Sequence, residues 1–257
     1  KIFSSEQLNQ ADKITTEKQQ ISSADLMERA GTLAFNWLHH RMQGAQVPIH
    51  IFCGIGNNGG DGLVIGRLLI ENGYNVHMFI VNFSDKRSSD FLTNYDRIKN
   101  VAKSWPFLMT SENDFPKIEK EDIIIDAIFG IGLNRCIDGW VLKLIQYLNA
   151  LKSFKLAIDM PSGLFANAPQ ENIEAVLKAN HTLTFQAPKL SFFLPATGKS
   201  VPYFEVLDLD LAPEYLFKAE PYNSKNIDEI ALDRLEKIRQ ANAEIPYLVV
   251  SDAESLN

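Results

Sequence analysis

The chain has 257 residues, of which 46% are apolar and 22% are charged, and its formal net charge is -7. This composition is typical of a globular protein and excludes the disordered, collagen-like and disulfide-scaffold classes. The longest apolar stretch, 123–133, is interrupted by Asp126 and falls short of the roughly 18 residues that span a bilayer. We therefore expect no membrane partner, and the negative charge predicts no nucleic-acid partner.

The cysteines are Cys53 and Cys136, far apart in the sequence and in neither CxxC nor zinc-site spacing. Such cysteines suit a reducing compartment. Because the first residues also show no secretory signal, we expect a cytoplasmic protein.

The apolar pattern predicts helices and strands that alternate along the chain. A long amphipathic helix is expected after Ser22 and Ser23, where apolar residues recur three and four apart. Short β-branched or apolar runs predict strands at 48–53, 75–81, 122–129, 155–159, 181–185 and 203–207. Helices are expected from 63 onward, at 90–101 and at 141–151. This alternation predicts a doubly wound α/β fold, with a mostly parallel sheet covered by helices on both faces.

The pattern changes after about residue 211. A charged helix is expected at 228–241, followed by the isolated apolar segment 247–250 and a polar end. We therefore predict a domain over residues 1–211 and a C-terminal extension or linker over 212–257.

In open parallel sheets, ligands bind beyond the carboxyl ends of the strands. The first strand is followed by a glycine-rich stretch, 54–62, which satisfies the G-x-G-x-x-G pattern of dinucleotide sites. No acidic residue ends the second strand, however, and Asp61 places a negative charge near the start of the helix, which argues against an ordinary NAD site. The alternatives are a tight turn for the glycines and an N-cap for Asp61.

The next strand ends are also rich in charged residues. Asp126 lies in an apolar strand, so its carboxylate needs a cation or several donors unless it simply begins a capped loop. Backbone N–H groups at Gly130 and Gly132, with the Arg135 guanidinium, are suited to phosphate, although Arg135 also fits an ordinary surface position. Asp159 ends a later strand and either takes part in the reaction or forms an Asx turn.

Lys189 follows the strand at 181–185 and is expected either to neutralise a phosphate, to tune a carboxylate, or to be solvated. The sequence contains no clear Ser/His/Asp or Cys/His nucleophile arrangement. The predicted chemistry therefore depends on carboxylates and backbone donors.

Five segments match a known family in order and spacing between about residues 5 and 211. They are 26–31 (LMERAG), 56–62 (GNNGGDG), 126–135 (DAIFGIGLNR), 159–163 (DMPSG) and 184–189 (TFQAPK). Together they resemble the YjeF N-terminal domain family, whose members are NAD(P)H-hydrate epimerases. The resemblance implies a Rossmann-like domain that interconverts the R and S hydrates of NADH and NADPH (NADHX and NADPHX), damaged cofactors with a hydroxyl at C6 of the nicotinamide ring.

The resemblance also implies the residues of the site. The residues that match the family's substrate site are Asn57, Asn58, Gly59, Gly60, Asp61, Gly130, Ile131, Gly132, Leu133, Asn134, Arg135, Cys136 and Asp159. A potassium ion is expected on Asn58, Asp126 and Ser162. The resemblance implies that Asp159 contacts the substrate. Because exchange of the C6 hydroxyl needs an acid, a negative charge and a base, Asp159 is also the expected catalytic residue, filling these roles in turn, and Lys189 is a candidate helper. Cys136 stands where proline is usual, which affects the rigidity of its loop.

We also expect a homo-oligomer, a dimer, and a fused or separate ADP- or ATP-dependent NAD(P)H-hydrate dehydratase as a partner. Residues 218–257 do not show that second enzyme's glycine-rich nucleotide motif. Two other functions remain open, an NAD(P)-dependent dehydrogenase and a nucleotide-binding regulatory or partner-binding module without catalysis.

Overall fold

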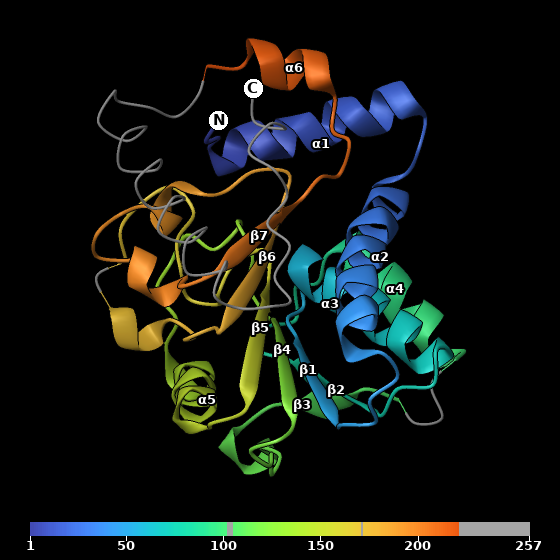
Figure 1. Cartoon of the computed structure of the whole chain (residues 1–257), viewed down its shortest axis with the longest axis vertical. Helices are drawn as coiled ribbons and strands as arrows, with labels where there is room; N and C mark the ends of the chain where they lie inside the picture. Colours follow the sequence, from blue (N-terminus) through green and yellow to red (C-terminus); the bar gives the residue numbers. More distant parts are fainter. Residues whose placement is uncertain (102–104, 171, 221–257) are drawn as a thin grey trace.

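The computed structural model describes residues 1–101, 105–170 and 172–220 (Figure 1). In this part of the chain, seven parallel strands form one sheet in the order β3-β2-β1-β4-β5-β6-β7. The strands are β1 (Ile49–Cys53), β2 (Val76–Val81), β3 (Phe107–Met109), β4 (Ile123–Ala127), β5 (Phe154–Ile158), β6 (His181–Phe185) and β7 (Phe204–Leu207). The strand order reverses between β1 and β4, which is where ligands bind in doubly wound folds.

Helices cover both faces of this sheet, so the predicted doubly wound α/β fold is confirmed. The α-helices are α1 (Ser5–Gln19), α2 (Ser23–Met42), α3 (Asn57–Glu71), α4 (Ser89–Lys99), α5 (Gly139–Ala150) and α6 (Pro213–Lys218). In Figure 1, α2, α3 and α4 lie on one side of the sheet and α5 on the other. None of the helices within the described ranges is long and apolar enough to cross a membrane.

Strand β1 shows why the central strands are mostly apolar. Ile49 and Ile51 pack into the core that contains residues of α2 and α3, whereas Phe52 packs into the core that contains residues of α5. A central parallel strand is covered on both faces, so both sets of side chains are buried. Asp126 of β4, paired in register with Phe52, is fully buried although it bears a carboxyl group.

Helix α1 lies across one end of the sheet, with α6 beside it (Figure 1). It begins with a capping box, in which Ser4 Oγ accepts from the Gln7 N–H and Gln7 Oε1 accepts from the Ser4 N–H. Near its other end, Thr15 Oγ1 accepts from the Ala212 N–H at 2.8 Å. The two ends of the described chain therefore meet over the sheet.

The structure contains every strand predicted from the sequence within the described residues, and adds α1, β3 and α6 to the expected elements. The helix predicted at 228–241 and the apolar segment 247–250 lie outside the described residues. The boundary predicted at residue 211 stays a prediction. Residues 212–220, on its far side, include α6, which lies beside α1.

Candidate functional site

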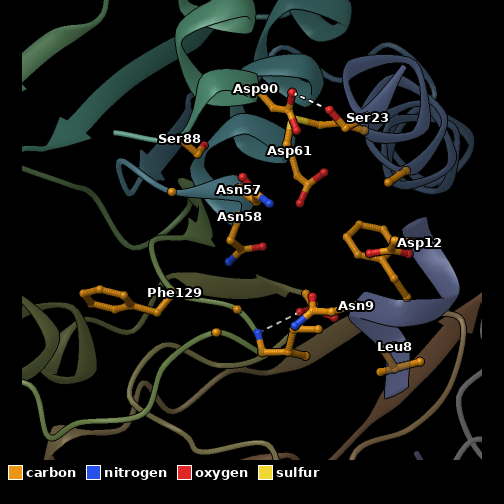
Figure 2. A pocket seen from close by; sticks show the side chains of 18 of the residues that line it. Leu8, Asn9, Asp12, Ser23, Asn57, Asn58, Asp61, Ser88, Asp90 and Phe129 are labelled. Carbon is orange, nitrogen blue, oxygen red and sulfur yellow. Dashed lines mark hydrogen bonds between the residues drawn. The ribbon is translucent and has the colours of Figure 1, made fainter. Parts of the chain in front are cut away.

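A cavity of about 830 Å³ lies at the carboxyl end of the sheet (Figure 2). Loops after β1, β4, β5 and β6 form part of its wall, and α1 forms another part. The predicted site residues that line it are Asn57, Asn58, Asp61, Gly130, Ile131, Gly132, Leu133, Asn134, Arg135, Asp159 and Lys189. Most of the predicted site is thus brought together around one space.

Three predicted substrate residues do not line this cavity. Gly59 and Gly60 are buried in the first turn of α3, and a Cβ on Gly59 would lie 1.9 Å from the Gly54 carbonyl oxygen. Cys136 lines a neighbouring cavity of about 680 Å³, which shares Asn9 and the loop 131–135 with the first. Substrate contact by these three residues stays a prediction, and the two glycines have a packing role that the structure explains.

Asp61 lies on α3 and its carboxyl group points into the cavity (Figure 2). The N-cap of α3 is Gly56, so the alternative interpretation of Asp61 as an N-cap is wrong. Burial raises the pKa of Asp61 well above its usual value, and the negative charges of Asp159, Asp12 and Asp90 raise it further. Asp61 is therefore suited to donate a hydrogen bond from a neutral carboxyl group.

Asp159 follows β5 in the left-handed backbone region, with φ of 63°, which directs its side chain back toward the loop after β4. Aspartate tolerates this region better than most residues do. One carboxylate oxygen, Oδ2, accepts from the Ile131 N–H at 3.0 Å, and the other, Oδ1, lies 2.9 Å from Lys189 Nζ. Asp159 thus presents a fixed negative charge at the cavity wall.

Lys189 is 1% exposed, so the alternative of a solvated lysine is wrong. Its ammonium group donates to Thr184 Oγ1 at 2.8 Å and to the carbonyl oxygens of Phe185 and Ala187 at 2.8 and 3.0 Å. A buried charge is tolerated when it is paired and hydrogen-bonded in this way. Lys189 is therefore a fixed partner of Asp159 rather than a free phosphate ligand.

The predicted potassium ligands lie at three neighbouring strand ends. The Asp126 carboxylate accepts from the Ser162 N–H at 2.7 Å, from Ser162 Oγ at 2.5 Å and from the Ile128 N–H at 3.2 Å. Burial raises the pKa of Asp126 to about 6, although these hydrogen bonds oppose the shift. Asp126 therefore has several donors beside it, as its burial requires.

Asn58 completes this group and fits a cation. Its side chain is 7% exposed, and neither amide atom has a hydrogen-bond partner among the described residues. A buried amide oxygen without a donor, beside a set of carboxylate and hydroxyl oxygens, matches the ligand preference of a hard cation. Potassium binding itself stays a prediction.

Sequence reasoning missed the part of the wall that comes from α1, including Asn9 and Asp12. Burial raises the pKa of Asp12 to about 6, and the charge of Asp159 adds to the shift while Lys189 opposes it. The Ser4-x-x-Gln7 capping box is a sequence pattern that predicts a helix here. Nothing in that pattern places the helix over the end of the sheet.

Comparisons with known proteins agree with this geometry. A family model described as YjeF-related protein N-terminus matches residues 23–191. The chain is 33% identical over 204 residues to an NAD(P)H-hydrate epimerase of Roseobacter litoralis, an alignment that covers 73% of this chain and 90% of that protein. It is 32% identical over 195 residues to a bifunctional NAD(P)H-hydrate repair enzyme Nnr of Dictyoglomus turgidum, covering 75% of this chain and 37% of the relative.

The fold also matches a solved structure. A crystal structure of the yeast protein ynu0 has a TM-score of 0.70 and 20% identity, and the match covers 88% of this chain and 96% of that one. The chain spans 34–43% of the length of four bifunctional relatives that it matches. Because the family model covers well over half of the residues, including most of those that line the cavity, the chain belongs to the family of YjeF-related protein N-terminal domains.

Proposed function

We propose that this protein is an isomerase that epimerises the R and S forms of NADH hydrate and NADPH hydrate, as a step in the repair of nicotinamide cofactors. The observation that carries the proposal is the buried Asp159–Lys189 ion pair, which faces the same cavity as the glycine loops. The names of relatives such as the epimerase of Roseobacter litoralis support it.

The chemistry of the hydrate explains why a carboxylate is needed. C6 carries both a hydroxyl group and the ring nitrogen, so loss of hydroxide leaves an iminium-like cation to which water returns on either face. Such a reaction needs an acid for the departing oxygen, negative charge near the cation, and a base for the returning water. Asp159 supplies the negative charge and the base, and Lys189 holds its carboxylate in one orientation.

The loop after β4 is suited to the phosphates of the substrate. The space around the Gly132 Cα is open, with no atom within 4 Å of a Cβ built there, so its backbone is accessible from the cavity. Arg135 lines the same wall and offers several donors to an anion. Local donors of this kind bind an anionic substrate although the net charge of the chain is -7.

We propose that Asn58, Asp126 and Ser162 hold a potassium ion beneath the cavity. The partnerless Asn58 amide oxygen and the buried Asp126 carboxylate support this assignment. When bound, the ion supplies a positive charge that helps to hold the oxygens of the substrate. Ser162 orients the Asp126 carboxylate through both its N–H and its hydroxyl group.

We further propose a homodimer, and a fused or separate ADP- or ATP-dependent dehydratase as a functional partner. The name of the bifunctional repair enzyme of Dictyoglomus turgidum supports the second partner. Both cysteines are free, and Cys136 is exposed, which suits a reducing compartment such as the cytoplasm.

The test is to mix the protein with one purified epimer of the hydrate and to follow its equilibration by chromatography. We expect the protein to accelerate equilibration well beyond the rate in buffer. Asp159→Asn should lower the rate by about 10²- to 10⁴-fold, the usual contribution of a positioned acid or base. Asp96→Asn, at a carboxylate that is 76% exposed on α4, is the matched control and should leave the rate unchanged. A wild-type rate equal to that in buffer would refute the proposed function.

A further inference from the structure

The proposed reaction needs a proton donor that Asp159 does not provide. Both oxygens of its carboxylate already accept, one from the Ile131 N–H and the other from the Lys189 ammonium group. In this ionised form the carboxylate is a base and a stabiliser of positive charge, and it has no proton to give to the departing hydroxide. The acid must therefore come from another group that lines the cavity.

Asp12 is placed to be that group. It projects from α1, whereas Asp159 comes from the end of β5, so the two carboxyl groups approach the cavity from different walls. The Asp159 carboxylate lies near Asn58, because a Cβ on Gly130 would be 2.8 Å from Asp159 Oδ2 and 3.3 Å from Asn58 Cβ. In Figure 2, Asp12 and Asn58 lie on opposite sides of the open space.

The Asp12 carboxyl group also has no polar partner in the described part of the chain. It makes no hydrogen bond or ion pair with any residue within the described ranges, unlike Asp90, which accepts from Ser23 Oγ at 2.8 Å. Asn58, which is 7% exposed and whose amide has no hydrogen-bond partner among the described residues, lines the same cavity. A half-buried carboxyl group without a protein partner is available to a substrate hydroxyl.

We propose that Asp12 is a second catalytic residue of the epimerase reaction, acting on one face of the nicotinamide ring while Asp159 acts on the other. This inference depends on the proposed function, because it assigns a role within that reaction. It also explains why a helix from the start of the chain forms a wall of the site.

The epimerisation uses one proton, which is shared between the carboxyl groups of Asp12 and Asp159. Protonated Asp12 gives its proton to the C6 hydroxyl, the C–O bond breaks with its electron pair going to oxygen, and water leaves. The ring nitrogen lone pair forms the new bond to C6 and the ring becomes cationic. Water then adds to C6 from the other face, its proton passes to Asp159, and the opposite epimer forms. The reverse reaction starts from protonated Asp159, and proton exchange with solvent resets the pair.

The electrostatics of the cavity favour this sharing. Burial and the negative charge of Asp159 raise the pKa of Asp12 to about 6, so Asp12 gains and loses its proton near neutral pH. Lys189 opposes the shift, Asp61 faces the same space, and Lys13 and Arg135 also line the cavity. Asp61 is more deeply buried than Asp12, and burial and the neighbouring carboxylates raise its pKa well above its usual value.

The experiment measures the rate of epimerisation from pH 5 to 9 for the wild type, Asp12→Asn, Asp12→Glu and the surface control Asp96→Asn. We expect Asp12→Asn to lower kcat by about 10²- to 10⁴-fold with a change in KM of less than about threefold. In the wild type, kcat/KM should fall as pH rises through the pKa of Asp12, because the shared proton is lost. Asp12→Asn should lose that dependence, and Asp12→Glu should recover part of the rate.

The outcomes separate the two proposals. If the wild-type protein does not epimerise the hydrate, the proposed function is refuted. A wild type that epimerises while a folded Asp12→Asn protein keeps its rate and pH profile overturns the role of Asp12 alone. If Asp12→Asn does not fold, Asp12→Ser is measured in its place, since it also removes the carboxyl group. A loss of rate with an unchanged pH profile would assign Asp12 to packing of α1 and would overturn its catalytic role.

Discussion

Two glycine-containing loops meet at the cavity, 54–62 after β1 and 130–135 after β4, and their glycines differ in what surrounds them. In the first loop, a Cβ on Gly54 or Gly59 would lie 2.0 or 1.9 Å from a backbone oxygen, and one on Gly62 would lie 2.7 Å from Ala127 Cβ. In the second loop, a Cβ on Gly132 would meet no atom within 4 Å. The first set allows α3 to pack closely on the sheet, whereas Gly132 leaves backbone open to a ligand.

A glycine motif therefore has to be interpreted position by position. A G-x-G-x-x-G match suggests phosphate contact along its whole length. Here Gly59 packs against the Gly54 carbonyl group. From the same segment, Asn57, Asn58 and Asp61 line the cavity. Four predictions test the contrast, in order of decreasing expected effect.

The largest effect is expected for Gly59→Ala. The added methyl group would overlap the Gly54 carbonyl oxygen, and backbone on both sides would have to move. We expect a loss of more than about 3 kcal/mol in the free energy of unfolding, measured by urea denaturation. Gly56→Ala is the matched control, because a Cβ at Gly56 meets no atom within 4 Å, and it should cost less than about 1 kcal/mol. Equal losses in the two variants would contradict the packing role of Gly59.

Asp61→Asn should stabilise the protein at neutral pH, with a gain of several degrees in Tm. The pKa of Asp61 is raised in the folded state by burial and nearby carboxylates, so its contribution to stability is fully present below the unfolded value near 3.8. The wild type loses that contribution as the pH rises through the raised pKa of Asp61 in the folded state. The asparagine variant has no carboxyl group to ionise there, so its stability does not fall for this reason. The Tm difference between variant and wild type should therefore grow from pH 4 to pH 8. A difference that is constant over this range would show that Asp61 is not desolvated.

Gly132→Val should weaken substrate binding without unfolding the sheet. The side chain enters open space, so no core atom is displaced, but it covers backbone that we assign to phosphate. We expect KM to rise about tenfold, which corresponds to about 1.4 kcal/mol, with Tm unchanged. Unchanged affinity in a folded Gly132→Val protein would remove this loop from phosphate binding.

The smallest effect is expected for potassium. The first loop contributes Asn58 to the proposed cation site, and Asp126 and Ser162 come from β4 and the loop after β5. At a few times its dissociation constant, potassium should stabilise the protein by about 1 kcal/mol, or roughly 2–4 °C in Tm. Replacing potassium with tetramethylammonium should abolish the gain, and so should Asp126→Ala. If the Tm of the wild type does not change when potassium is replaced, the result would argue against the proposed cation site.

Much of the sheet and of the site was predictable because both follow from local sequence. Strand β4 is apolar on both faces apart from Asp126, and Asp159 directly follows β5. The carboxyl ends of parallel strands lie along one edge of a sheet, which brings such residues together without knowledge of any contact. Strand β3 was not predictable, since Phe107 and Leu108 are half exposed and the strand has three residues.

The rest of the site depends on contacts between residues far apart in the sequence. The burial of Lys189 depends on acceptors from β6 and on Asp159, which no local pattern around Lys189 reveals. Asp12 reaches the cavity because α1 crosses the sheet, and Thr15 is joined there to Ala212, 197 residues away. A capping box predicts that a helix begins, but not what it covers.

The attachment of α1 has a consequence for hydrogen exchange. The helix buries Leu8, Ala11 and Thr15, and its first residue, Ser5, donates its N–H to Asn167 Oδ1 at 3.0 Å. Elements with few buried side chains open by local fluctuations at a lower free energy than the central strands. We therefore expect amide protons of α1 to exchange with solvent faster than those of β1. If each opening moves Asp12 away from the cavity, a substrate that binds the closed form should slow exchange along α1 more than along the sheet.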